Sequence, residues 1–282
     1  MREHIFYGAL YHFFVLTMNR RYRAFVPHRG ISVAREFLLH LRRLLLMPWH
    51  SLQRAFESWR IRTGGFPYHL VLLQLDHDAS FRAHSDFRST TDFIDACLQA
   101  FAEGAPRHHH IVFKAHPLED DRSAVVATIR AGTRRLGLAG RVHFLRGGKL
   151  ARLLDGARSA VTVNSTAGLH AVGAGKPVLW RGLPLKAMGR AVYSLPEFVS
   201  DQPLADFFAA PTRPDSRGYR DYRHYLLETS QIPGGFYASR GRHQILRHVV
   251  DMMLSAEDPY DALISGKAAQ RQQLPGTERR NW

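Results

Sequence analysis

The sequence predicts an α/β protein built on a Rossmann-like parallel sheet, with helical segments before and after it. Two observations support this: short apolar runs alternate with helical patterns through the middle of the chain, and three of those runs end in polar clusters. Strands buried on both faces read as continuous apolar runs, and doubly wound sheets bind ligands at the carboxyl ends of their strands. The length of 282 residues, 45% of them hydrophobic, suits one large domain or two small ones.

The first 65 residues are predicted to be a helical segment. From Gly30 to Arg62, apolar residues recur at helical spacing with arginines between them, and glycines and a proline end the pattern. An apolar and aromatic stretch at 5–18 precedes it, beside several arginines. This stretch is shorter than the roughly 20 residues that a bilayer-spanning helix needs. It suits an interfacial membrane helix or a helix buried against the rest of the protein.

Residues 66–257 are predicted to form the sheet domain and the helices that follow it. Strands are expected at 69–74, 110–114, 141–145, 160–164 and 177–180. Helices are expected from about 89, at 123–136, at 150–157 and from about 166, followed by three more near 203–208, 217–229 and 240–254. Residues 258–282 are polar and without pattern, which predicts a disordered tail.

The charge balance is strongly basic, with 39 Lys and Arg against 24 Asp and Glu, a formal charge of +15. Such a chain is expected to bind something anionic: nucleic acid, acidic lipid headgroups, or a phosphorylated or carboxylated substrate. No recognisable nucleic-acid motif is present, so nucleic acid is not an expected partner. The single cysteine, Cys97, excludes an intramolecular disulfide and a cysteine-based zinc cluster, and its apolar helical surroundings predict core packing.

Three polar clusters that follow predicted strands are expected to meet at one edge of the sheet. They are QLDHDAS at 74–80, KAHPLEDD at 114–121 and NSTAG at 164–168. In the last of these, Ser165 and Thr166 stand where a strand leads into a helix, which suits an anion site or ordinary helix capping. Lys114 adds a positive charge and His116 a titratable donor. Together these groups suit the stabilisation of a phosphate leaving group.

Metal binding is the competing interpretation of two motifs. The stretch from Asp76 to Asp78 matches the metal-binding Asp-x-Asp of one class of glycosyltransferases, a short motif that arises often by chance. The three histidines at 108–110 begin a predicted strand, where consecutive side chains point in alternate directions. The histidines are therefore predicted to lie in a solvated or partly packed loop, and no metal site is predicted.

In order and spacing, these motifs resemble the capsule polysaccharide proteins of the KpsS/LipB type, which are β-Kdo transferases. The resemblance spans about residues 20–237 and is carried by YRAFVPHRGISVARE at 22–36, LQLDHDASFRAHSDF at 73–87, VFKAHP at 112–117, VTVNSTAGLHAVGAGKPV at 161–178 and TSQIPGGFY at 229–237. It implies that the sheet domain is the C-terminal half of a GT-B-like fold. Ala115 stands where the family often has another histidine, and most of the family's N-terminal domain is expected to be missing before the PHRG segment.

The resemblance implies retaining transfer of Kdo from CMP-Kdo to a phosphatidylglycerol-type lipid on the cytoplasmic face of the inner membrane. In the family pattern an Asp follows Gln74 by four residues, which implies Asp78, rather than Asp76, as the nucleophile. No cofactor is expected besides the donor substrate CMP-Kdo. The implied site comprises the catalytic residues Asp78 and His116 and the donor-binding residues Gln74, Lys114, Asn164, Ser165, Thr166 and Gly168.

Two alternative functions stay open. A CDP-glycerol-type polyol-phosphate transferase also uses a CMP-activated donor and has a similar Lys-x-His-Pro. A non-catalytic capsule export or assembly component is compatible with a shortened N-terminal region. The expected partners are a nucleotide-sugar donor, an anionic lipid acceptor, the membrane surface, and capsule assembly or export proteins.

Overall fold

The computed structural model describes residues 2–18, 32–76, 78–116, 119, 124–181, 200, 202–213, 216–229, 231–232, 239–255, 258 and 261. The chain divides into two compact units, Met1–Ser216 and Arg217–Trp282. Apart from residues 258 and 261, the predicted tail lies outside the described residues. So do the PHRG segment, the arginines at 20, 21 and 23, and most of TSQIPGGFY.

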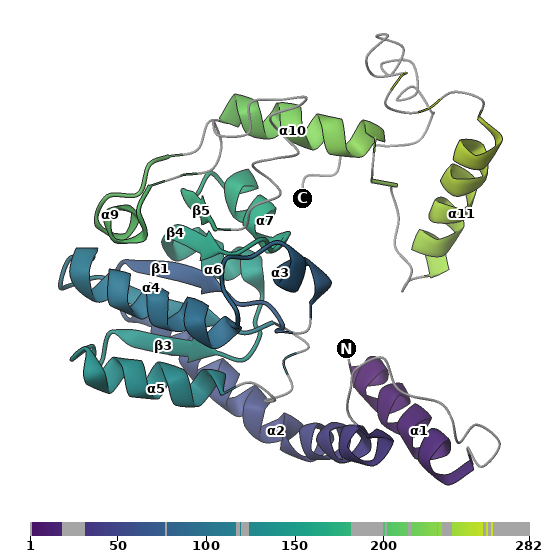
Figure 1. Ribbon diagram of the computed structural model, residues 1–282, viewed down its shortest axis with the longest axis horizontal. Helices are drawn as coiled ribbons and strands as arrows, with labels where there is room; N and C mark the ends of the chain where they lie inside the picture. The colour runs from purple at the N-terminus through teal and green to yellow at the C-terminus, as the bar shows by residue number, and fades with distance from the viewer. Residues whose placement is uncertain are drawn as a thin grey trace. The chain divides into compact units, whose positions relative to one another are not determined.

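In unit 1, five described strands form a parallel sheet with the order β3-β2-β1-β4-β5 (Figure 1). The strands are β1 (Tyr68–Leu72), β2 (His110–Lys114), β3 (Val142–Leu145), β4 (Ala157–Thr162) and β5 (Val178–Trp180). The chain steps from β1 outward to β3 on one side and then returns beside β1 to continue outward through β4 and β5. This topology confirms the predicted Rossmann-like sheet, and it places a reversal of strand order between β1 and β4, where such sheets bind ligands.

Helices follow the strands as the alternating pattern predicts. They are α3 (Ala79–Ala83), α4 (Thr90–Gly104), α5 (Val125–Arg135), α6 (Leu150–Gly156), α7 (Ala167–Gly173) and α9 (Leu204–Ala209). Helix α4 packs beside α5 and α9, whereas α6 packs beside α7 and contacts β1 and β4. Helix α3 was not predicted, because five residues are too few to show a helical period.

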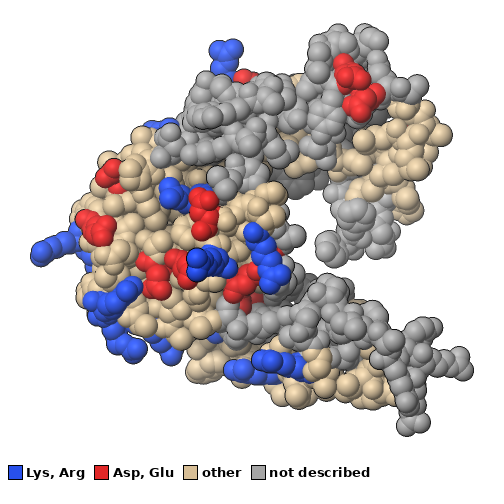
Figure 2. Space-filling model, viewed as in Figure 1, with Lys and Arg blue, Asp and Glu red and all other residues tan. Residues whose placement is uncertain are grey.

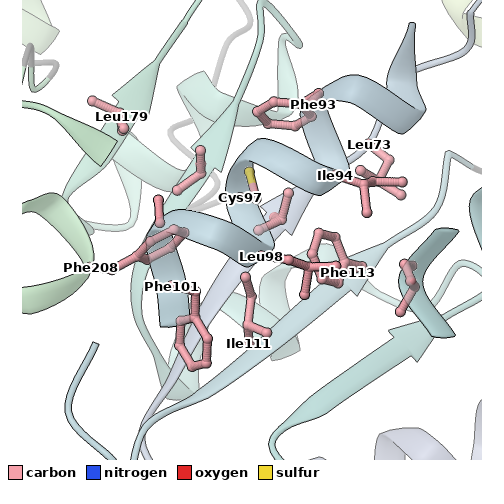
Figure 3. Close-up of a cluster of buried hydrophobic side chains, with 14 of the residues drawn as sticks. Leu73, Phe93, Ile94, Cys97, Leu98, Phe101, Ile111, Phe113, Leu179 and Phe208 are labelled. Carbon is pink, nitrogen blue, oxygen red and sulfur yellow. The ribbon is translucent and has the colours of Figure 1, made fainter. Parts of the chain in front are cut away.

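The core lies between α4 and the sheet (Figure 3). Phe93, Cys97 and Phe101 follow one another at helical spacing and are almost fully buried against strand residues such as Ile111 and Phe113. The structure thus confirms Cys97 as a core residue, and burial raises the pKa of its thiol. Each such side chain contributes roughly 1.5–3 kcal/mol of burial free energy.

Strand boundaries differ from prediction most at β4, which runs from Ala157 to Thr162 instead of 160–164. Its first residues, Ala-Arg-Ser, lack the branched apolar side chains that mark a strand. Ala157 and Ser159 nevertheless face inward while Arg158 is exposed. At the other end Asn164 has left the strand, because its backbone N–H donates to a side chain instead of to the sheet.

Two helices precede the sheet, α1 (Arg2–Met18) and α2 (Val33–Thr63), in agreement with the predicted helical segment. Ser32 caps α2 by accepting a hydrogen bond from the Arg35 backbone N–H (3.4 Å), and the helix contacts β3. In the part of the chain that the structure describes, no helix is long and apolar enough to cross a membrane.

Unit 2 holds α10 (Ser216–Thr229), except for its first residue, and α11 (Ser239–Leu254). Both lie within a residue of the ranges that the helical periodicity predicts.

Candidate functional site

The carboxyl ends of the five described strands lie at one edge of the sheet. Leu72 of β1 is in register with Lys114 of β2 and Thr162 of β4, and these are in turn in register with Leu145 of β3 and Trp180 of β5. The three polar clusters that follow β1, β2 and β4 therefore start from neighbouring strands at the same edge, as the sequence predicts.

Lys114 ends β2 and exposes only 8% of its surface. Its ammonium group has no hydrogen-bond or ion-pair partner among the described residues. Burial of the charged form lowers the pKa of Lys114 below its usual value. Lys114 is thus a nearly buried cation without a partner in the described part of the chain, at the edge where doubly wound sheets bind ligands.

Gln74 and Asn164 bind each other across the neighbouring ends of β1 and β4. Gln74 Nε2 donates to Asn164 Oδ1 (2.6 Å), and the Asn164 backbone N–H donates to Gln74 Oε1 (2.9 Å). Gln74 is buried, and Asn164 Nδ2 also donates to the carbonyl of His84 (3.4 Å). Their predicted role in donor binding stays a prediction, and the structure shows that they also hold together two strand ends and the loop after α3.

The two aspartates after β1 have different surroundings. Asp76 Oδ1 accepts a hydrogen bond from the Thr90 backbone N–H (2.7 Å), which satisfies a free donor at the start of α4. The Asp78 carbonyl accepts from the Arg82 backbone N–H (3.0 Å), so Asp78 directly precedes α3. Asp76 therefore supports a helix, whereas Asp78 begins one and its side chain is half-buried.

Ser165, Thr166 and Gly168 form the turn from β4 into α7. Ser165 Oγ accepts from the Ala167 backbone N–H (3.2 Å), so its hydroxyl already caps this short helix, while the Thr166 side chain is exposed. Gly168 permits a close approach: a Cβ there would lie 3.0 Å from Thr162 Cγ2 and 3.4 Å from the Trp180 ring. Gly168 is therefore a packing position in the structure, and only Thr166 presents an uncommitted side chain.

His116 follows Lys114 by two residues and is half-buried just beyond the end of β2. Its carbonyl accepts a hydrogen bond from the Glu119 backbone N–H (3.0 Å). Ala115, in the position where the family often has a histidine, is buried. Pro117 lies outside the described residues.

Of the three consecutive histidines, His109 is buried and His110 half-buried, whereas His108 is exposed. His109 Nδ1 lies 3.0 Å from His69 Nε2, and His110 Nδ1 lies 2.8 Å from His143 Nε2, so neighbouring side chains point to opposite sides as predicted. Burial lowers the pKa of His109 to about 4, and the surrounding positive charges add to this effect. Among the described residues, no group of three or more His, Cys, Asp or Glu side chains is placed to hold a metal ion.

Two residues at the end of β5 were missed by the sequence reasoning. Trp180 is buried, and its indole N–H has no hydrogen-bond partner among the described residues. Arg181 follows it and is exposed at the same edge as Lys114. A basic residue directly after a short apolar run is the signal that drew attention to Lys114, and it could have indicated Arg181 as well.

A family model for "Capsule polysaccharide biosynthesis protein" matches residues 7–237. The capsule polysaccharide export protein KpsS of Escherichia coli is 30% identical over 170 residues, which cover 60% of this chain and 42% of that protein. The capsule polysaccharide modification protein LipB of Neisseria meningitidis Z2491 is 29% identical over 234 residues, covering 82% of this chain and 54% of LipB. The chain thus spans about half the length of these relatives.

Two solved structures show weaker likeness. Thermosulfurimonas dismutans KpsC, a beta Kdo 2,7 transferase, has a TM-score of 0.33 and 18% identity, with 62% of this chain and 57% of that chain covered. The calicheamicin glycosyltransferase CalG4 has a TM-score of 0.31 and 16% identity, with 74% and 45% covered. The family match extends over all five strands and each polar strand end described above. The chain belongs to the capsule polysaccharide biosynthesis protein family.

Proposed function

We propose that the chain is a glycosyltransferase that moves Kdo from CMP-Kdo to a phosphatidylglycerol-type lipid with retention of configuration. The observation that carries this proposal is Lys114, which is nearly buried at the carboxyl edge of the sheet and has no partner among the residues that the structure describes. Burying a cation without a partner costs stability, and a bound phosphate removes that cost. The chain's family and its +15 charge agree with an anionic, CMP-activated donor.

In the proposed reaction the Asp78 carboxylate attacks the anomeric carbon of Kdo, and the bond from that carbon to the phosphate oxygen breaks. CMP leaves with the bonding electron pair, and Lys114 and His116 stabilise its phosphate. The acceptor hydroxyl then attacks the same carbon and releases its proton to water, while the bond to Asp78 breaks and Asp78 leaves as a carboxylate. Two inversions give retention.

The other site residues take supporting roles in this proposal. Thr166 supplies a hydroxyl to the phosphate, and Ser165 sets the turn that presents it by capping α7. Gln74 and Asn164 act as positioning residues, because their mutual hydrogen bonds hold the ends of β1 and β4 together. Gly168 lets α7 approach β4 closely enough for this arrangement.

We propose that the protein acts at the cytoplasmic face of the inner membrane, where it is bound peripherally. Support comes from α2, where six apolar side chains are between 53% and 71% exposed. This α2 stripe consists of Leu38, Leu45, Trp49, Leu52, Phe56 and Trp59. From Leu45 onward the spacing alternates between four and three residues, which places these side chains on one helical face. Tryptophan and phenylalanine beside arginines suit the interface of an acidic bilayer.

Incubation of the purified chain with CMP-Kdo and phosphatidylglycerol tests the reaction. The proposal predicts CMP release that depends on the lipid and a lipid product heavier by one Kdo residue. Asp78→Asn should abolish the product while CMP binding persists, because it removes the nucleophilic charge and leaves the phosphate contacts in place.

A non-catalytic role in capsule export or assembly makes a different prediction. Such a component binds CMP-Kdo or lipid and releases no CMP. Saturable binding by a folded chain without turnover, alone and with the other capsule proteins of its source, would favour that role over the transferase.

A further inference from the structure

A groove of about 620 Å³ lies between α2, α5 and β3, in a size range that suits small ligands. Strand β3 is the outermost strand on its side of the sheet, and α2 contacts it. The groove is lined by residues from all three elements and none from β1 or β4. It is therefore built separately from the candidate donor site between those strands.

Five arginines line the groove, against a single carboxylate, that of Glu57. They are Arg54 and Arg60 on α2, Arg130 and Arg134 on α5, and Arg146 directly after β3. Figure 2 shows Lys and Arg side chains gathered at the lower left, the region of α5 in Figure 1. Arg60 is close to Glu57 (3.7 Å), so the carboxylate offsets only a small part of this charge.

The two α5 arginines are exposed and line the groove together. The Arg130 and Arg134 guanidinium groups make no hydrogen bond or ion pair with any described residue. They are four residues apart on one helix, a spacing at which like charges repel and destabilise the helix. An anion between α5 and α2 reverses that repulsion.

A buried donor or acceptor also faces this region. The His143 side chain is 1% exposed, and its Nδ1 has no hydrogen-bond partner among the described residues. The nearest carboxylate oxygen, Oε2 of Glu57, lies 3.9 Å away, beyond hydrogen-bond distance. His143 Nε2 is already held by His110 at 2.8 Å, which fixes the ring with Nδ1 in the groove wall.

We propose that this groove is a second anion-binding site and that it takes a phosphate ester. Guanidinium forks match the oxygens of a phosphate, and a phosphate offers enough oxygens to engage arginines from two helices together. Apolar side chains of Phe56, Val126 and Phe144 line the same groove and provide a surface for the organic part of the ester. The inference goes beyond the transferase reaction and does not depend on it.

Two probes distinguish the sources of such an ester: glycerol 3-phosphate for a soluble metabolite and short-chain phosphatidylglycerol for a lipid headgroup. The full chain carrying Lys114→Met is titrated with each, so that the donor site does not contribute. Introducing Arg130→Gln together with Arg134→Gln should weaken the affinity at least tenfold. The matched pair Arg152→Gln and Arg213→Gln removes the same charge from exposed positions outside the groove and should change it less than twofold.

A second readout does not depend on the stability of a variant. The Nδ1 nitrogen resonance of His143 should shift when the phosphate ester is added, while that of the exposed His108 stays in place. Tighter binding of the lipid than of glycerol 3-phosphate identifies a headgroup site, and equal binding identifies a soluble ester. The proposal is overturned if the Arg130→Gln, Arg134→Gln double variant binds the phosphate esters as tightly as the Arg152→Gln, Arg213→Gln control does. It is also overturned if glucuronate, which carries a carboxylate and no phosphate, binds as well as the phosphate esters.

Discussion

At the scale of single residues, Asp76 and Asp78 lie two positions apart, and we predict that their mutations have different effects. Mutation of Asp78 should abolish transfer, whereas mutation of Asp76 should lower stability. Asp76→Ala removes the acceptor for the Thr90 N–H at the start of α4. We expect it to lower the free energy of unfolding by about 1 kcal/mol, the usual cost of losing a helix cap. Asp76→Asn keeps an acceptor oxygen and should cost less. Urea denaturation measures both, with the exposed Asp86→Ala as the control, and equal stability of Asp76→Ala and wild type would contradict the capping role.

The burial of His69 predicts that the stability of the folded chain decreases in acid. Its ring lies 2.7 Å from Ser159 Oγ, and burial, with smaller effects of His109 and Arg158, lowers the pKa of His69 from 6.5 to about 3. The unfolded chain takes up this proton near pH 6.5 and the folded chain does not. Stability is therefore complete above pH 6.5 and declines as the pH falls from 6.5 towards 3.

Replacing His69 with Gln should flatten this decline by up to about 1.4 kcal/mol per pH unit, the value for one proton. The comparison is the slope of unfolding free energy between pH 6.5 and 4.5, so a general loss of stability does not obscure it. His108→Gln, at an exposed neighbour, should keep the wild-type slope. The same slope in all three proteins would show that His69 does not carry the effect.

At the scale of elements, the ends of β1 and β4 depend on the hydrogen bonds between Gln74 and Asn164. Gln74→Ala leaves the Asn164 N–H without its acceptor, which should cost about 1–3 kcal/mol in this partly buried place. Asn164→Ala should add less in the double variant than alone, because the two residues share one interaction. Gln99→Ala, which removes an exposed hydrogen bond within α4, is the matched control. Fully additive losses would mean that the pair does not act as a unit.

The same elements show what the sequence can and cannot predict. Apolar runs located all five described strands, and the polar residues after β1, β2 and β4 correctly indicated one shared edge, because parallel strands end together. Nothing local indicates that Gln74 binds Asn164, 90 residues away, or that Asp76 caps α4. Such pairings depend on strand order, which hydrophobic periodicity does not reveal.

At the scale of the whole molecule, the basic charge and the α2 stripe together predict binding to acidic membranes. Trp49→Ser with Trp59→Ser should greatly reduce flotation with phosphatidylglycerol vesicles, since both rings are exposed and their loss does not disturb the core. Added salt should weaken wild-type binding because it screens the basic residues. Met253→Ser with Leu254→Ser removes two exposed apolar side chains of α11 and should leave flotation intact.

Two outcomes would contradict membrane binding through α2. One is equal flotation with neutral and acidic vesicles. The other is that the wild-type chain self-associates without lipid and the Trp49→Ser, Trp59→Ser double variant does not. That result would mean that the α2 stripe contacts a second copy of the chain.

The central claim is that the carboxyl edge of the sheet binds the phosphate of a CMP-activated donor through Lys114, and calorimetric titration with CMP tests it most directly. Lys114→Met keeps an unbranched side chain one atom shorter and removes a nearly buried charge that has no partner among the described residues. The account predicts CMP affinity at least tenfold weaker, with stability to urea unchanged or increased because the desolvation cost is gone. Lys176→Met, at a half-buried lysine hydrogen-bonded to the Asp155 carbonyl, should leave CMP affinity unchanged. Wild-type CMP affinity in Lys114→Met would contradict the account.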